Sequence, residues 1–84
     1  MLISTRSRYA LRALTELIRL SDGGPVSLGV LAERQEIPLR YLEQIFGRLR
    51  AAGLVKGKRG PGGGYVLTRP SEQIPLIEIV AALE

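Results

Sequence analysis

The chain has no cysteine and no histidine among its 84 residues. The missing thiols exclude disulfides, thiolate metal ligands and cysteine nucleophiles, and the missing imidazoles exclude histidine metal sites. Without either residue type, a nucleophile and its base would require Ser or Thr beside Lys or Arg, and no motif indicates such a pair. We therefore expect no enzyme activity, no catalytic residues, and no metal or cofactor held by this chain.

Long hydrophobic runs are also missing, because the longest falls well short of the roughly 20 residues that cross a bilayer. Residues 1–6 lack the extended apolar segment of a secretory signal, which favours a cytoplasmic protein that binds no membrane. Apolar residues nevertheless make up 45% of the sequence, enough for a hydrophobic core. At this length, we expect residues 1–84 to form one small domain around a single core.

Positive charge is concentrated in two stretches of the sequence. Residues 40–59 carry six Lys and Arg residues against one Glu, and residues 1–20 carry four Arg residues against one Glu. The other two stretches, 21–39 and 60–84, are each net negative, so the whole chain carries only +4. Such a distribution is typical of a face that meets a polyanion, and ordinary solvated arginines are the alternative.

The spacing of apolar residues predicts four helices, over residues 5–20, 28–35, 38–52 and 76–83. The second and third are joined by a turn of very few residues, which is typical of a helix-turn-helix. The residues expected to face the core are Tyr9, Ala10, Ala13, Leu14, Leu17 and Ile18 in the first helix, and Leu39, Leu42, Ile45, Phe46 and Leu49 in the third.

The opposite face of the third predicted helix is centred on Arg40, Gln44, Gly47 and Ala51. Glycine in a helix costs about 1 kcal/mol relative to alanine, so small residues on an exposed face favour close approach to another surface. Arg pairs with guanine O6 and N7, Gln pairs with adenine N6 and N7, and Glu43 on the flank can accept from cytosine N4. The pattern predicts a recognition helix, with a merely solvated polar face as the alternative.

Residues 54–56 and 65–67 are predicted to form short strands on either side of the basic, glycine-rich segment 57–64. A hairpin directly after a helix-turn-helix is typical of a wing, and Val26 could add a short edge strand. Four glycines among residues 60–64 exceed what a hairpin turn needs, which favours a loop whose backbone approaches DNA. Arg59 precedes them and could enter a narrow A·T-rich minor groove. The segment matches neither a P-loop nor a dinucleotide-binding pattern, so we expect no nucleotide site.

Residues 41–46, Tyr-Leu-Glu-Gln-Ile-Phe, and residues 59–65, Arg-Gly-Pro-Gly-Gly-Gly-Tyr, form two motifs at a specific spacing. Together with residues 4–10 and 53–55, they strongly resemble the Rrf2 family of bacterial transcription regulators, over essentially the whole chain. The resemblance implies a winged-helix dimer that binds operator DNA as a repressor or dual regulator. The third helix would lie in the major groove, and the wing in the minor groove.

Family members often sense iron–sulfur clusters, nitric oxide, redox state or cysteine metabolism. Those that bind a cluster hold it through three cysteines in a loop beyond the winged helix, ahead of a long dimerisation helix. This sequence carries neither region, so the resemblance implies no cluster within this chain and a homodimer only in the full-length protein. The sequence also has Glu36 in the turn where many relatives carry glycine. A non-glycine residue there costs on the order of 1 kcal/mol if the turn is left-handed.

We therefore predict a mostly α fold with a small β-hairpin: a winged helix-turn-helix with a three-helix core, a wing and a C-terminal helix. The predicted function is sequence-specific DNA binding in transcriptional regulation. A winged helix used for protein–protein interaction is the alternative, disfavoured by the charge of residues 40–59, and a nonspecific nucleic-acid binder is a third possibility, disfavoured by the few aromatic residues. The predicted DNA-binding residues are Arg6, Arg8, Arg40, Tyr41, Glu43, Gln44, Arg48, Arg50, Lys58, Arg59, Gly60, Gly62 and Gly63.

Overall fold

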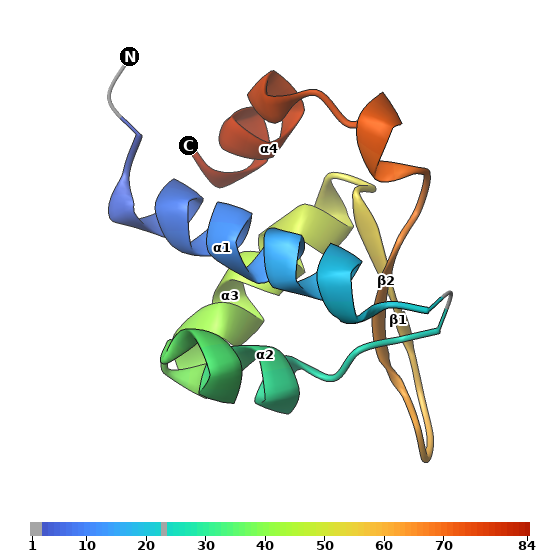
Figure 1. The fold of residues 1–84 in the computed structure, drawn as a ribbon. Coiled ribbons are helices and arrows are strands. Elements are labelled where there is room, and N and C mark those ends of the chain that lie inside the picture. Colours follow the sequence, from blue (N-terminus) through green and yellow to red (C-terminus); the bar gives the residue numbers. More distant parts are fainter. Residues whose placement is uncertain (1–2, 23) are drawn as a thin grey trace.

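The structure, a computed structural model, describes residues 3–22 and 24–84; Met1, Leu2 and Gly23 lie outside the described residues. Within that part of the chain, four α-helices surround a core and a two-stranded hairpin projects from one side (Figure 1). The predicted mostly α fold with a wing is confirmed. The elements are α1 (Thr5–Leu20), α2 (Leu28–Gln35), α3 (Leu39–Ala51), β1 (Val55–Lys58), β2 (Gly64–Leu67), the 3-10 turn η1 (Ser71–Gln73) and α4 (Leu76–Leu83).

Hydroxyl groups fix where the first two helices begin. The side chain of Ser4 accepts a hydrogen bond from the Ser7 N–H at 3.1 Å, and Ser27 accepts one from the Val30 N–H at 3.2 Å. Each satisfies a backbone donor that the first helical turn leaves free. By contrast, α3 starts one residue later than predicted, after Pro38, which makes no side-chain cap.

The core is centred on α3, which contacts α1, α2, α4 and β1. Its residues Leu42, Ile45, Phe46 and Leu49 are completely buried. Two residues predicted to face the core do not: Leu39 is 46% exposed and Ile18 is 45% exposed. Leu39 lies in the first turn of α3, at the edge of its apolar stripe, and Ile18 lies at the edge of an open hollow beside α1.

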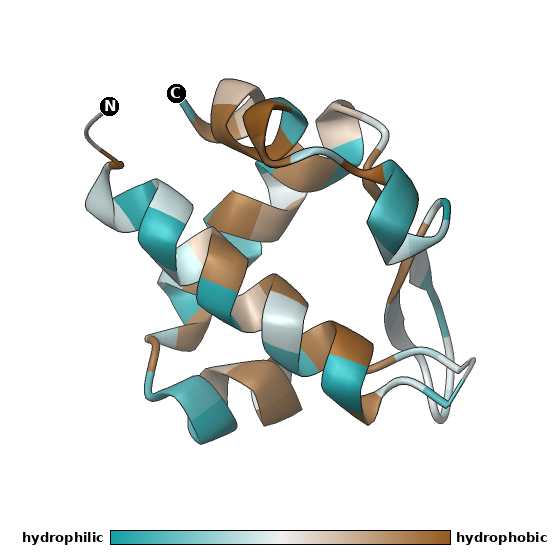
Figure 2. Ribbon diagram, turned by 45° about the horizontal axis from the view of Figure 1, so that its top comes forward, coloured by the Kyte–Doolittle hydropathy of each residue, from teal (hydrophilic) through white to brown (hydrophobic). Residues whose placement is uncertain are grey.

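Helix α4 closes the domain on the side of α1 opposite α2 (Figure 1). Figure 2 shows α4 as predominantly hydrophobic, whereas α1 and α2 contain both hydrophobic and hydrophilic residues. Ile79, Val80 and Leu83 are buried, and Leu76 and Ile77 are exposed. Across residues 3–22 and 24–84, no helix combines the length and the apolar character that a membrane span requires.

The wing is an antiparallel pair in which Val55 lies opposite Leu67 and Lys58 lies opposite Gly64. Its strands extend closer to the tip than the sequence predicts, because ladder hydrogen bonds come from the backbone and admit residues of low strand propensity. The predicted short edge strand at Val26 is confirmed as a bridge to Tyr65, with N–H to carbonyl distances of 3.0 and 2.8 Å.

The turn between α2 and α3 places Glu36 in the left-handed region, at φ 53° and ψ 46°. Its backbone N–H donates to the carbonyl groups of Ala32 and Glu33, which closes the end of α2. The next residue, Ile37, is buried and begins the approach to α3. The turn at Glu36 is therefore left-handed, a conformation that is sterically unfavourable for a residue with a Cβ atom.

We expect Glu36→Gly to raise the free energy of unfolding by about 1 kcal/mol, because relief of left-handed strain exceeds the added entropy of the unfolded chain. Thermal denaturation should show a rise in Tm of roughly 4–8 °C. Glu36→Gln keeps the Cβ atom and removes only the charge, so it should leave Tm unchanged. A lower Tm for Glu36→Gly would contradict this account of the turn.

Candidate nucleic-acid interface

The outward face of α3 presents most of the predicted base-reading residues to solvent. Arg40, Glu43 and Gln44 are exposed, as are Arg48 and Ala51 farther along the helix. These side chains lie opposite the buried stripe that holds α3 in the core, so packing of that stripe fixes the direction in which they point. The face is polar, mixed in charge and unobstructed by other elements at Gly47, where an added Cβ would meet no atom within 4 Å.

Tyr41 differs from its predicted neighbours because it is half-buried. Its ring packs edge-to-face on Tyr9 of α1, with 5.6 Å between the ring centroids and 79° between the planes. Aromatic pairs prefer this arrangement, in which the edge of one ring meets the face of the other. Tyr41 therefore joins the start of α3 to α1.

The structure brings the end of α3 and the wing together around one open hollow of about 380 Å³. Three predicted DNA-binding side chains line it: Arg50 from α3, Lys58 from β1, and Arg59 from the wing loop. All three are exposed. Three cations around one depression give a strong positive potential, which favours a backbone phosphate of a nucleic acid.

Tyr65 of β2 also lines this hollow, and sequence reasoning did not select it as a site residue. Its ring packs on Phe46 of α3, with 5.1 Å between centroids and 62° between planes. This contact attaches the wing to the buried side of the recognition helix. The signal available in the sequence was an aromatic residue directly after the glycine run.

The backbone geometry of the hairpin itself requires the glycines of the wing. A Cβ atom at Gly63 would come within 2.3 Å of the Lys58 carbonyl oxygen, and one at Gly64 within 2.3 Å of the Val26 carbonyl oxygen. Gly60 and Gly62 both have left-handed φ values. The expectation that four glycines exceed what the turn needs is therefore wrong. DNA contact by Gly60, Gly62 and Gly63 stays a prediction.

The arginines at the start of α1 already donate hydrogen bonds to other residues of the domain. Arg6 donates from Nη1 to the Leu83 carbonyl oxygen at 3.0 Å, and it is half-buried. Arg8 is exposed and donates from Nη2 to the Thr5 hydroxyl at 3.3 Å. Arg8 is therefore better placed than Arg6 for the predicted phosphate contact.

The two ends of the described chain lie side by side, because Glu84 accepts hydrogen bonds from serines at the start of α1 (Figure 1). Ser7 Oγ donates to its carboxylate at 2.6 Å, and Ser4 Oγ donates to the same oxygen. The bond from Ser4, followed by that from Ser7, lowers the pKa of Glu84, with smaller help from the charges of Arg6 and Arg48 and against desolvation by burial. The carboxylate thereby holds the end of α4 against α1.

A second polar network, missed by the sequence analysis, lies between α1 and the end of α2. Glu16 is buried at 5% exposure, and it accepts hydrogen bonds from Arg19 and Gln35. The Arg19 bond holds the pKa of Glu16 below its usual value against the opposing effect of burial, and Gln35 and Arg34 add to the lowering. An acidic residue at the margin of the apolar stripe of α1, with Arg three residues later, was the available signal.

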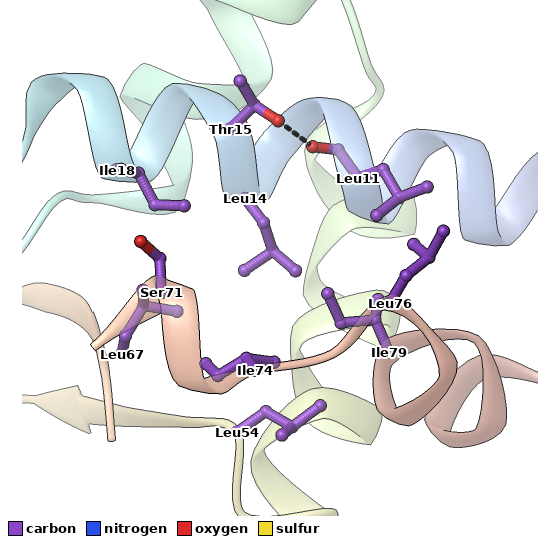
Figure 3. A pocket seen from close by; sticks show the side chains of 10 residues that line it. All are labelled: Leu11, Leu14, Thr15, Ile18, Leu54, Leu67, Ser71, Ile74, Leu76 and Ile79. Carbon is purple, nitrogen blue, oxygen red and sulfur yellow. Dashed lines mark hydrogen bonds between the residues drawn. The ribbon is translucent and has the colours of Figure 1, made fainter. Parts of the chain in front are cut away.

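An apolar hollow of about 210 Å³ lies between α1 and the segment from β2 to α4. Figure 3 shows Leu14 and Ile18 pointing into it from α1 toward Ile74 and Leu67, and Leu11 pointing toward Leu76. Its lining offers few polar groups, and the Thr15 hydroxyl donates to the Leu11 carbonyl oxygen at 2.7 Å (Figure 3). The hollow therefore has little with which to orient a polar ligand.

The residues of this chain do not fit an iron–sulfur cluster or another cofactor that needs soft ligands. The sequence contains no cysteine or histidine. Among the residues that the structure describes, no group of three or more acidic side chains is placed to hold a metal ion. Clusters are held by cysteine thiolates, so no donor set for one is present in this chain.

Comparison with known proteins gives consistent matches. The family model named Rrf2, described as an iron-dependent transcriptional regulator, matches residues 3–84. An HTH-type transcriptional regulator of Haemophilus influenzae is 53% identical over 83 residues, covering 99% of this chain and 55% of the relative. The HTH-type transcriptional regulator IscR of Cereibacter sphaeroides is 51% identical over 86 residues, covering 100% of this chain and 56% of the relative.

The solved structure of CymR, the global cysteine regulator of B. subtilis, superposes with a TM-score of 0.93 at 42% identity. The match covers 100% of this chain and 65% of the CymR chain. The present chain thus spans little more than half the length of the curated relatives it matches. On the family match, the sequence identity and the shared fold, the chain belongs to the Rrf2 family of transcriptional regulators.

Proposed function

We propose that this chain is the sequence-specific DNA-binding part of a bacterial transcription regulator. The observation that carries the proposal is the polar outward face of α3, continuous with the cations of the wing around one hollow. Arg40, Glu43 and Gln44 would read base edges in the major groove, and Arg59 would enter the minor groove. Arg8, Arg48, Arg50 and Lys58 would contact phosphates.

The finer features of the function follow from the same assignment. The relatives are regulators of transcription rather than enzymes, and we propose that this chain likewise regulates transcription in the cytoplasm without catalysis. We further propose that it represses or dually regulates its operator, and that the full-length protein is a homodimer. Two copies of one wing and one recognition helix would then read a pseudo-palindromic site.

Fluorescence-anisotropy titration across a salt series tests the proposed function. A duplex obtained by selection from random sequences should bind at least a thousandfold more tightly than random DNA. The logarithm of affinity should fall linearly with the logarithm of salt concentration, with a slope near −0.9 per phosphate contact. Equal, salt-dependent affinity for both duplexes would instead indicate a nonspecific binder, and no binding at low salt would favour protein–protein interaction.

Gly47→Ala separates fold stability from DNA binding. The added methyl group enters open space in the free protein, so helix propensity alone should raise the free energy of unfolding by about 1 kcal/mol. The same methyl group stands on the face that meets the duplex, so binding should weaken by about 1–3 kcal/mol. Denaturant unfolding and anisotropy titration measure the two effects. Unchanged affinity would show that DNA does not approach α3 at this position.

Arg59→Ala tests the assignment of the wing to the minor groove. Narrow A·T-rich grooves attract the guanidinium, so duplexes with A·T-rich flanks should lose about 1 kcal/mol or more beyond the loss on G·C-rich flanks. Lys56→Ala is the matched control, because Lys56 is exposed on β1 of the same hairpin. It should weaken both duplexes equally. Equal losses for Arg59→Ala on the two flanks would rule out the minor-groove role.

A further inference from the structure

Glu16 is a buried carboxylate that the proposed DNA interface does not use. Its side chain is 6% exposed, and its oxygens accept from Arg19 Nη2 at 2.6 Å and Gln35 Nε2 at 2.8 Å. Arg34 Nε lies 3.6 Å from the same carboxylate. Burying a carboxylate costs free energy unless its lone pairs are satisfied, and a buried apolar residue would avoid that cost. We therefore expect the Glu16 carboxylate to fix how α1 and α2 are placed relative to each other.

Arg12, one turn earlier on α1, donates hydrogen bonds to the same end of α2. Its Nε donates to the Gln35 Oε1 at 3.2 Å, and its Nη2 donates to the Gln35 backbone carbonyl. Gln35 is the last residue of α2, and the left-handed Glu36 follows it directly. Arg12 and Glu16 thus hold both the side chain and the main chain of the residue from which the turn to α3 departs.

The contacts continue from Arg12 to the start of α3. The Arg12 guanidinium carbon lies 5.4 Å from the centroid of the Tyr9 ring, which is the geometry of a cation–π contact. Tyr9 in turn packs edge-to-face on Tyr41, in the first turn of α3. A continuous set of side chains on α1 therefore contacts the turn between α2 and α3 at both of its ends.

We propose that Arg12 and Glu16 are positioning residues that set the angle of α3, and so its base-reading side chains, without touching DNA. The inference rests on the proposed function, because it assigns a consequence for base reading. It gives Arg12 a role other than the polyanion contact that the positive charge of residues 1–20 suggests. Two of the three guanidinium nitrogens are already bonded to Gln35.

The two roles of Arg12 predict different results for a charge-conserving substitution. Arg12→Lys keeps a cation that can contact phosphate, but one ammonium cannot reproduce two hydrogen bonds in a fixed fork together with stacking on Tyr9. A positioning role predicts that preference for the selected duplex over random DNA falls about tenfold, with an unchanged salt slope. Arg69→Lys is the matched control and should keep the preference. Arg69 likewise donates to a main-chain carbonyl, that of Gln73, and to a side chain, that of Glu78, and it lies outside both this network and the proposed DNA contacts.

Glu16→Gln tests the other end of the network, and it is nearly isosteric. Because the variant loses one negative charge, electrostatics alone predicts that it binds any duplex as tightly as the unsubstituted chain, or more tightly. Positioning predicts the opposite for the selected duplex: a preference reduced about tenfold. Glu33→Gln makes the same charge change at an exposed site on α2 and should leave the preference intact.

A double variant distinguishes positioning from general destabilisation. Glu16→Gln combined with Gln35→Glu restores one carboxylate and one amide between α1 and α2, with Glu at position 35 accepting from Arg12. We expect it to recover most of the lost preference, whereas a merely destabilised fold would show no such rescue. Circular dichroism at the binding temperature measures the folded fraction, by which each affinity is corrected.

Two results would contradict the positioning role. Full preference in both Arg12→Lys and Glu16→Gln overturns the positioning role. A shallower salt slope for Arg12→Ala, by about 0.9, also overturns it, because that change counts one lost phosphate contact. If the unsubstituted chain itself shows no preference between duplexes, the proposed function fails first and this inference falls with it.

Discussion

The burial of one face of α3 is the constraint on which the rest of the molecule depends. Leu42, Ile45, Phe46 and Leu49 have no exposed surface, and α1, α2, α4 and β1 all pack around them. Full burial of such side chains stabilises a fold by roughly 1.5–3 kcal/mol each. A helix held this firmly on one side has to present its opposite side, with Arg40 and Gln44, to the surroundings.

Contacts with α3 also fix the position of the wing. Phe46 contacts Tyr65 from within the core, and the backbone of Tyr65 pairs with Val26 in the segment before α2. The hairpin is thereby tied to both halves of the helix-turn-helix, and its cations fall beside Arg50 at the end of α3. The proposed major-groove and minor-groove contacts are thus parts of one rigid arrangement. Polar contacts around Gln35 complete it at the other end of α3.

Elements governed by local periodicity and capping could be predicted from the sequence. The bounds of α1, α2 and α4 agree with the prediction, since serine caps, prolines and apolar spacing mark the ends of these helices. For the turn at Glu36, the sequence predicts a steric cost only if the turn is left-handed, and the structure shows that it is. These signals lie within a few residues of the feature that they specify.

What could not be predicted depends on partners distant in the sequence. Periodicity marks Ile18 and Leu39 as apolar positions, but only the packed neighbours decide that both stay partly exposed. Gly64 looks like a flexible loop residue until the backbone of Val26 is found beside it. Likewise, Arg6 and Arg12 contribute to a basic stretch in the sequence, and their acceptors, Leu83 and Gln35, are far along the chain.

Dimethyl sulfate footprinting of a selected duplex tests the central claim most directly. The reagent methylates guanine N7 in the major groove and adenine N3 in the minor groove, so it reports on both grooves at once. The account predicts protection of guanine N7 where α3 lies and of adenine N3 in the flank where the wing lies. Tight binding that protects neither atom would mean that the chain contacts only the DNA backbone, which would contradict base reading by α3.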